Sequence, residues 1–179
     1  TSNLRKSIIK NSLTIGGIIL FLGVMAMQNH VEIYNTSVTR YWQQVQHQLV
    51  RRYYLVLQLE NAALIQLKNS RLNTDTTTNF RNLLLQDDTR KAVEWANAVE
   101  QQLQEIGSSS QMSALNNTTT FRSLIHEFKD LETRLVLEVY QYNQSVQFVQ
   151  HRYQNSVYKL FFRLQRIDNP ILFAPHYLF

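Results

Sequence analysis

A long uncharged stretch near the N-terminus limits what this chain can fold into more than any other feature. No residue between Lys10 and Glu32 carries a fixed charge, and Thr14 is the only polar side chain from Leu13 to Met27. As a helix, the uncharged residues 11–31 would measure roughly 31 Å, which matches the hydrocarbon core of a bilayer. The stretch therefore predicts a transmembrane helix. Its apolar side chains include Leu13, Ile15, Ile18, Ile19, Leu20, Phe21, Leu22 and Val24.

A secretory signal peptide is the alternative for this segment. Arg5, Lys6 and Lys10 would form its basic region, and Val24-Met25-Ala26 offers a small-residue cleavage site. The helical pattern continues past Ala26 without a turn signal, which favours a retained span.

The basic residues around the span predict its orientation. Three precede it with no acidic residue among them, whereas the first basic residue after it, Arg40, is preceded by Glu32. By the positive-inside rule, residues 1–10 should be cytoplasmic and residues 32–169 should lie outside the cytoplasmic membrane. In a Gram-negative bacterium, that places them in the periplasm at the inner membrane.

The scarcity of helix-breaking residues predicts an all-α fold. The chain has four Gly and two Pro, and Gly107 is the only one of either between Val24 and Asn169. We expect one helix from 11 to 72, continuous through the membrane boundary, a second from about 78 to 106, and a third from 121 to 167. Residues 86–89 interrupt the second pattern, so that helix could be kinked or split.

Each expected helix carries an apolar stripe at spacings of three and four, which favours packing against other helices. The inward positions of the first are Val38, Trp42, Val45, Leu49, Val56, Leu59, Ala63 and Leu67. Those of the second are Phe80, Leu84, Ala92, Trp95, Val99, Leu103 and Ile106. Those of the third are Phe121, Leu124, Phe128, Leu131, Leu135, Val139, Tyr142, Val146, Val149, Tyr153, Val157, Leu160, Leu164 and Ile167.

These helices should form an elongated antiparallel bundle of three to four helices. With three crossings, the third helix would point away from the membrane and the apolar tail 170–179 would lie at the far tip. If the second helix is split into a hairpin, the tail returns to the bilayer; we favour the first arrangement. Aromatic residues near the end would either cap the core or contact a partner. They are Phe161, Phe162, Phe173, Tyr177 and Phe179.

Three groups of residues follow the order and spacing known from one protein family. The first comprises Tyr34, Asn35, Val38, Trp42, Gln44, Val45, Gln48, Leu49, Arg51 and Arg52. The second comprises Leu115, Phe121, Leu124, Leu131, Glu132 and Arg134, and the third Tyr142, Asn143 and Val146. Together they resemble the LemA family, as a divergent member: Tyr53–Leu57 replaces the usual Leu-Ile-Pro-Asn-Leu. The resemblance implies a bacterial single-pass membrane protein with a helical bundle and no agreed activity; one branch belongs to magnetosome membrane formation.

Nothing in the sequence points to catalysis, a cofactor or a metal. The five His show no metal-ligand spacing, there is no Cys, and no phosphate-binding loop is present. The net charge of +5 is spread along the chain, which argues against nucleic acid as a partner. We read the Tyr-Asn pairs, Tyr34-Asn35 and Tyr142-Asn143, as structural residues that fix helix register. The expected function is a non-enzymatic scaffold or assembly subunit that binds other proteins or further copies of itself. The alternative is a sensory or signal-relay bundle that works with a membrane partner.

Overall fold

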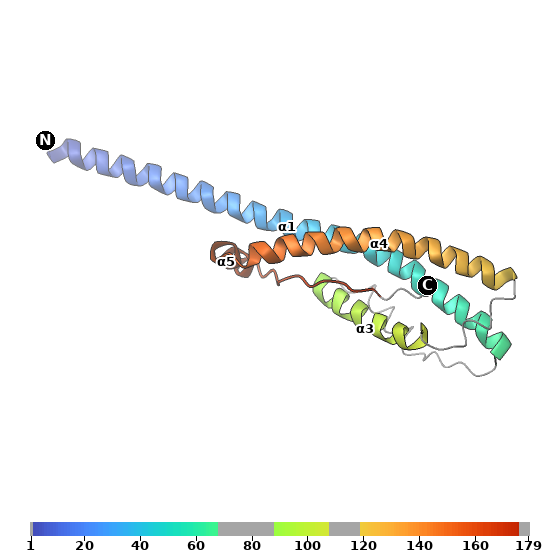
Figure 1. Cartoon of the computed structure of the whole chain (residues 1–179). Helices are drawn as coiled ribbons and strands as arrows, with labels where there is room; N and C mark the ends of the chain where they lie inside the picture. The colour runs from blue at the N-terminus through green and yellow to red at the C-terminus, as the bar shows by residue number, and fades with distance from the viewer. Residues whose placement is uncertain (1, 68–87, 108–118, 176–179) are drawn as a thin grey trace.

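The protein is a bundle of helices with one helix projecting far beyond it. The computed structural model describes residues 2–67, 88–107 and 119–175, and all secondary structure within these ranges is helical (Figure 1). The helices are α1 (Ser2–Leu67), α3 (Thr89–Gly107), α4 (Thr119–Tyr153) and α5 (Ser156–Leu164). The predicted all-α class is therefore confirmed.

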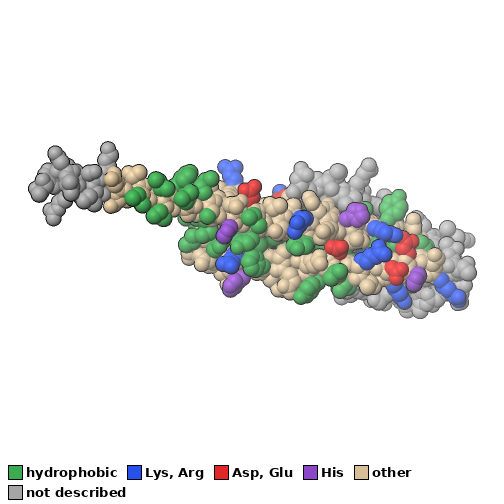
Figure 2. Space-filling model, turned by 90° about the horizontal axis from the view of Figure 1, so that it is seen from above, with side chains coloured by type: hydrophobic (Ala, Val, Ile, Leu, Met, Phe, Trp, Pro, Cys, Tyr) green, Lys and Arg blue, Asp and Glu red, His purple; other side chains and the backbone are tan. Residues whose placement is uncertain are grey.

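Helix α1 is unbroken from the projecting segment into the core of the bundle. Its 66 residues would extend roughly 100 Å. The side chains of residues 11–26 are all exposed, and Val31 is the first one fully buried (Figure 2). The predicted continuity is thus confirmed as far as Leu67, and 68–72 lie outside the described residues. By length and composition, α1 contains one stretch suited to crossing a membrane, near the N-terminus and wholly exposed.

Helix α4 packs along α1 in the antiparallel direction, and this pair forms the centre of the bundle. The ring of Tyr142 lies 5.3 Å from that of Trp42, and the ring of Phe148 lies 5.3 Å from that of Tyr34. Later residues of α4 thus meet earlier residues of α1. The predicted inward stripe of α4 is buried from Phe128 to Val149, as the three-and-four spacing requires.

Helix α3 runs parallel to α1, so the favoured three-crossing arrangement was wrong. Thr89 at its start donates a hydrogen bond to Thr39 (3.4 Å), and Glu100 farther along reaches Arg52. The favoured arrangement required α3 to run antiparallel to α1 and α4 to run parallel to it. Instead α4 runs back toward the projecting part of α1, and α5 lies at that end of the bundle (Figure 1).

Helix α3 begins at Thr89, within the polar interruption that the sequence shows at 86–89. The Asp88 carboxylate accepts hydrogen bonds from the backbone N–H groups of Arg90 (3.0 Å) and Lys91 (3.4 Å), which is N-capping geometry. Residues 78–87, predicted as helical, lie outside the described residues. Trp95, predicted inward, is 41% exposed. The buried face of α3 is instead centred on Ala92, Val93, Ala96 and Glu100.

The third predicted helix ends early, at Tyr153, and this corrects the expectation of one helix to 167. Asn155 adopts an extended backbone, and its side chain caps α5 by accepting from the N–H of Val157 at 3.0 Å. The break changes the direction of the chain. Consequently Val157, Leu160 and Leu164, predicted inward, are more than half exposed, and Phe162 is buried in their place.

After α5 the chain turns back along the bundle. Arg166 has a positive φ of 55°, and the N–H of Ile167 donates to the Phe162 carbonyl (2.9 Å). The N–H of Arg166 donates to the Arg163 carbonyl (3.1 Å), which completes a Schellman helix end. The residues that follow lie between α3 and α4 and bond to both helices.

Candidate functional site

The most prominent polar feature of the core is an ion cluster centred on Arg52. Its guanidinium donates to Glu100 Oε1 (2.5 Å) and to Glu132 Oε1 (3.2 Å). Tyr53 donates its hydroxyl hydrogen to the same Glu100 oxygen at 3.0 Å. Arg52, Glu100 and Glu132 are each at most 5% exposed. The cluster therefore connects α1, α3 and α4 through charges removed from water.

The environment keeps Arg52 charged and Tyr53 neutral. Burial lowers the pKa of Arg52, but the Coulombic attraction of Glu100, its hydrogen bond and the charge of Glu132 outweigh burial, so the pKa ends above its ordinary value. Burial, and then the charge of Glu100, raise the pKa of Tyr53 well above 10. Arg52 and Tyr53 therefore keep their protons near neutral pH and contribute to a fixed arrangement of the three helices.

A second group of signature residues holds the chain that follows α5. The side-chain amide of Asn143 donates to the Phe173 carbonyl (2.8 Å) and accepts from the Phe173 N–H (2.9 Å). Tyr142 donates its hydroxyl hydrogen to the Ile171 carbonyl at 2.8 Å, and burial raises its pKa above the ordinary range. The hydrogen-bonding groups of Tyr142 and Asn143 thus hold the tail, while the ring of Tyr142 packs on Trp42 of α1.

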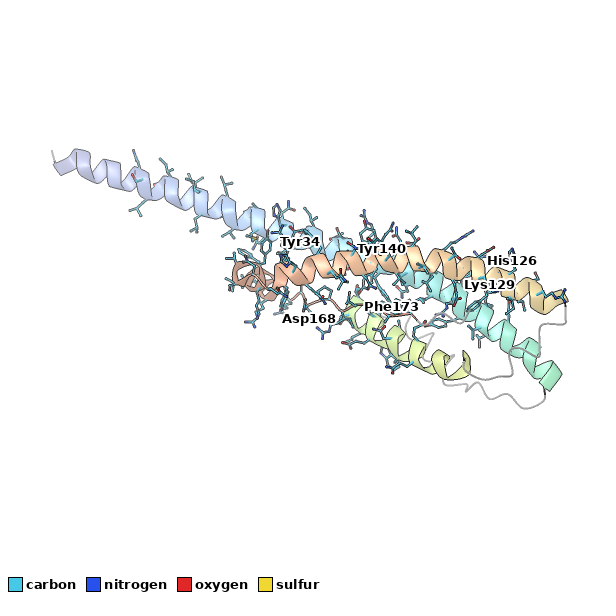
Figure 3. The ribbon with its side chains drawn as sticks, viewed as in Figure 1. Tyr34, His126, Lys129, Tyr140, Asp168 and Phe173 are labelled. Carbon is cyan, nitrogen blue, oxygen red and sulfur yellow. The ribbon has the colours of Figure 1, made fainter. Side chains whose placement is uncertain are left out.

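Phe173 is the anchor of this tail. It is 1% exposed, and its ring packs edge-on against Trp42 with 5.6 Å between centroids (Figure 3). Phe162 is fully buried and packs on Tyr153. These two aromatic residues cap the core of their own chain, so they do not form a free surface for a partner. Phe161 is half-buried against the same core, while Tyr177 and Phe179 lie outside the described residues.

Tyr34, the first signature residue, lies where α1, α4 and α5 meet (Figure 3). Its ring contacts those of Phe148 and Tyr158, at 5.3 and 6.2 Å. Burial and the neighbouring Tyr158 raise its pKa. Asn35, its partner in the motif, is exposed and lines a surface hollow of about 260 Å³ together with Arg90 and others.

The remaining signature residues divide between core and surface. Val45 and Leu49 are fully buried, and Leu124 is partly buried beside Phe128. Arg51, in contrast, is about half exposed and pairs with the exposed Glu127 at 2.9 Å. Gln48 lines the same small surface cleft as Arg51 and Glu127. Phe121 lies in α4, but its side chain is not among those described.

Several residues that hold this arrangement were not predicted. Glu100 stands four residues after Ala96, on the apolar face of its helix. Because a buried charge needs a partner of opposite charge, an acidic residue at such a position indicates a buried cation opposite it. Asn97 holds the tail from the α3 side: it donates to the Leu172 carbonyl (3.1 Å) and accepts from the Ala174 N–H (3.0 Å). Gln150 donates to the Pro170 carbonyl at 2.7 Å. Nothing in the sequence distinguishes these two amides from surface residues.

The outer side of α4 carries a stripe of apolar side chains that are largely exposed. Leu137, Tyr140 and Phe148 are 58, 61 and 49% exposed, and their spacing places them on one side of the helix. Tyr140 is labelled in Figure 3, and one part of the Phe148 ring contacts Tyr34 and the Arg152 guanidinium. Gln144 lies between Tyr140 and Phe148 and donates to the Tyr140 hydroxyl (3.1 Å). From 139 to 150 no residue carries a fixed charge. Such a surface suits contact with another protein.

Among the described residues, no three His, Cys, Asp or Glu side chains converge as a metal site would require. Comparisons with protein-family models, curated proteins and solved structures find no match to this chain. Membership of the LemA family therefore stays a prediction that rests on the motifs themselves.

Proposed function

We propose that this chain is a membrane-anchored scaffold that assembles with further copies of itself. In this proposal the N-terminus is cytoplasmic, the first part of α1 crosses the bacterial inner membrane, and the bundle stands in the periplasm. The role agrees with what the LemA resemblance implies. The observation that carries the proposal is the uncharged apolar stripe of Leu137, Tyr140 and Phe148 on α4.

The charge pattern favours a second copy as the occupant of this stripe. Two identical surfaces can approach only if like charges do not face each other. The exposed α4 residues from Tyr140 to Phe148 are uncharged, so two copies can pair over this part of the stripe without repulsion. The anchor adds to this, because molecules confined to one membrane meet at a high effective concentration.

The mass of the full chain in mild detergent, measured by light scattering after size exclusion, tests the proposal. We expect a dimer or larger assembly for the wild type and a monomer for Leu137→Arg, which places a charge at the first position of the stripe. Tyr54→Arg is the matched control, since Tyr54 is 64% exposed on α1, outside the stripe. Helix content measured by circular dichroism should be equal in all three proteins.

Two outcomes would contradict this function. A wild-type protein that is monomeric at all concentrations would contradict the proposed self-association. If Leu137→Arg and Tyr54→Arg have the same mass as the wild type, association would arise elsewhere, for instance through the small residues of the span, and the α4 stripe would have no part in it.

A further inference from the structure

Helix α5 lies at the end of the bundle from which α1 projects. The ring of Tyr158 contacts that of Tyr34, and Gln165 donates a hydrogen bond from Nε2 to the Gln28 carbonyl at 3.1 Å. Gln28 directly follows Met27, the last residue of the apolar stretch. The short helix is therefore level with the point at which α1 changes from apolar to polar (Figure 1).

That level is where a bilayer surface would be. The uncharged residues 11–31 would measure roughly 31 Å, enough for a hydrocarbon core, but only Leu13 to Met27 (roughly 22 Å) is almost entirely apolar. The polar side chains of Gln28, Asn29 and His30 therefore belong to the end of the span, where the hydrocarbon core gives way to the headgroups. Residues next to Gln28 would consequently meet lipid headgroups.

The side chains of α5 divide into three groups around its axis. Phe162 is fully buried against the bundle. Val157, Leu160 and Leu164 are 52, 56 and 65% exposed and follow each other at spacings of three and four, so they share a second side. Lys159 and Arg163, both exposed and four residues apart, carry positive charge on a third. No acidic residue occurs within α5.

We propose that α5 is an interfacial helix that lies on the membrane surface beside the span. Its exposed apolar side enters the boundary between headgroups and acyl chains, and Lys159 and Arg163 contact lipid phosphates. An apolar side flanked by basic residues is the pattern of helices that bind in the plane of a bilayer. This inference rests on the proposed anchoring of α1 in the membrane.

The position of α5 favours lipid over a protein as its occupant. Its exposed apolar side chains lie at the same end of the bundle as the apolar, fully exposed part of α1 (Figure 2). Lipid would cover both surfaces as one continuous environment. A helix of nine residues would bind a membrane weakly by itself. Here the fold and the span already hold it at the surface, so the cost of bringing it there is small.

Because the chain contains no Cys, one nitroxide label can be placed at a single introduced thiol. The full chain is reconstituted in vesicles of phosphatidylcholine, with or without phosphatidylglycerol. The label is placed by Leu160→Cys, by Phe21→Cys in the span, or by Tyr54→Cys in the bundle, three positions 56–64% exposed. Collisions of the label with oxygen, which concentrates in lipid, are compared with collisions with a water-soluble nickel complex.

We expect the label at Leu160→Cys to collide mainly with oxygen, as at Phe21→Cys, and the label at Tyr54→Cys mainly with nickel. Nickel-dominated collisions at Leu160→Cys would overturn the inference, while Phe21→Cys would still report an inserted anchor. Low collision rates with both reagents would overturn it in favour of a protein contact. If Phe21→Cys also collides with nickel, the anchor and the inference both fail.

The basic residues have a separate test. Adding Lys159→Gln and Arg163→Gln to Leu160→Cys should abolish any deeper insertion in phosphatidylglycerol vesicles and leave the pure phosphatidylcholine result unchanged. Inorganic phosphate in the buffer should not reproduce the loss. Equal insertion in both vesicle types before and after the substitutions would overturn the contact between these residues and lipid phosphates.

Discussion

Two adjacent arginines on α1 occupy different electrostatic environments. Arg51 is about half exposed and pairs with the exposed Glu127, an arrangement that typically contributes ~0–1 kcal/mol. Arg52 is fully buried between Glu100 and Glu132 and lies over the ring of Phe128. Removing its charge would leave two carboxylates in the core without their cation, which costs about 3–5 kcal/mol.

We therefore predict that Arg52→Leu destabilises the bundle strongly and that Arg51→Leu hardly changes it. The measurement is urea unfolding of the full chain in mild detergent, followed by far-ultraviolet circular dichroism. The neighbouring position serves as the control for lost charge and lost side-chain length. Equal shifts in the two midpoints would show that the buried cluster is not what connects the helices.

Asn143 allows a test of the tail at the same scale. Its amide makes two hydrogen bonds with the backbone of Phe173, and a leucine of similar size can make neither. We predict that Asn143→Leu releases the tail and speeds chymotrypsin cleavage after Phe173, at a stability cost of ~1–3 kcal/mol. Gln144→Leu, an exposed change one residue away, should leave the cleavage rate as in the wild type. A rate unaffected by Asn143→Leu would mean that the packing of Phe173 on Trp42 alone holds the tail.

At the level of elements, hydrophobic periodicity predicted α1 and the first part of α4 correctly. Each helix buries one side where the two meet, from Val31 to Leu55 of α1 and from Phe128 to Val149 of α4, so burial and spacing agree there. The same rule failed beyond Tyr153, where α4 ends. Val157, Leu160 and Leu164 continue the spacing, but they lie in α5, which runs in another direction, and their side chains are exposed. Asn155, the N-cap of α5, marks the break, but it could not be recognised because Asn, Gln and Ser occur throughout this chain.

The C-terminal end of α5 depends on a positive φ angle at Arg166, and substitutions there can show how much this angle contributes to stability. Arg166 has a φ of 55°, a region that costs a residue with a Cβ about 1–2 kcal/mol. We predict that Arg166→Gly keeps the free energy of unfolding or raises it by up to that amount, because glycine has no Cβ. Arg166→Val should lower it, because a branched Cβ fits this region less well than that of arginine. Chemical unfolding in detergent compares the two variants. A lower stability for the glycine variant would mean that contacts of the Arg166 side chain outweigh the backbone strain.

At the scale of the whole molecule, the sequence did not predict the order in which the helices run. The direction of α3 is set by contacts distant in sequence, such as Thr89 with Thr39 and Glu100 with Arg52. Neither contact can be predicted from the spacing of apolar residues along the sequence. The same holds for the tail, whose backbone bonds to amides on two helices. Local patterns therefore predicted the elements, and a few long-range polar contacts decided their arrangement.

The unbroken path of α1 has a geometric consequence for the molecule in a membrane. An α-helix turns by about 100° and rises by ~1.5 Å per residue. The number of residues in α1 therefore determines the rotation of the bundle about the helix axis and its distance along that axis from the N-terminal segment. Between Met27 and Val38 no loop is present to absorb an error. One added residue there would turn the bundle by more than a quarter of a circle and carry α5 to another side of the span. If α1 spans a membrane as we propose, the length of this connection sets which side of the bundle each molecule presents to neighbouring copies.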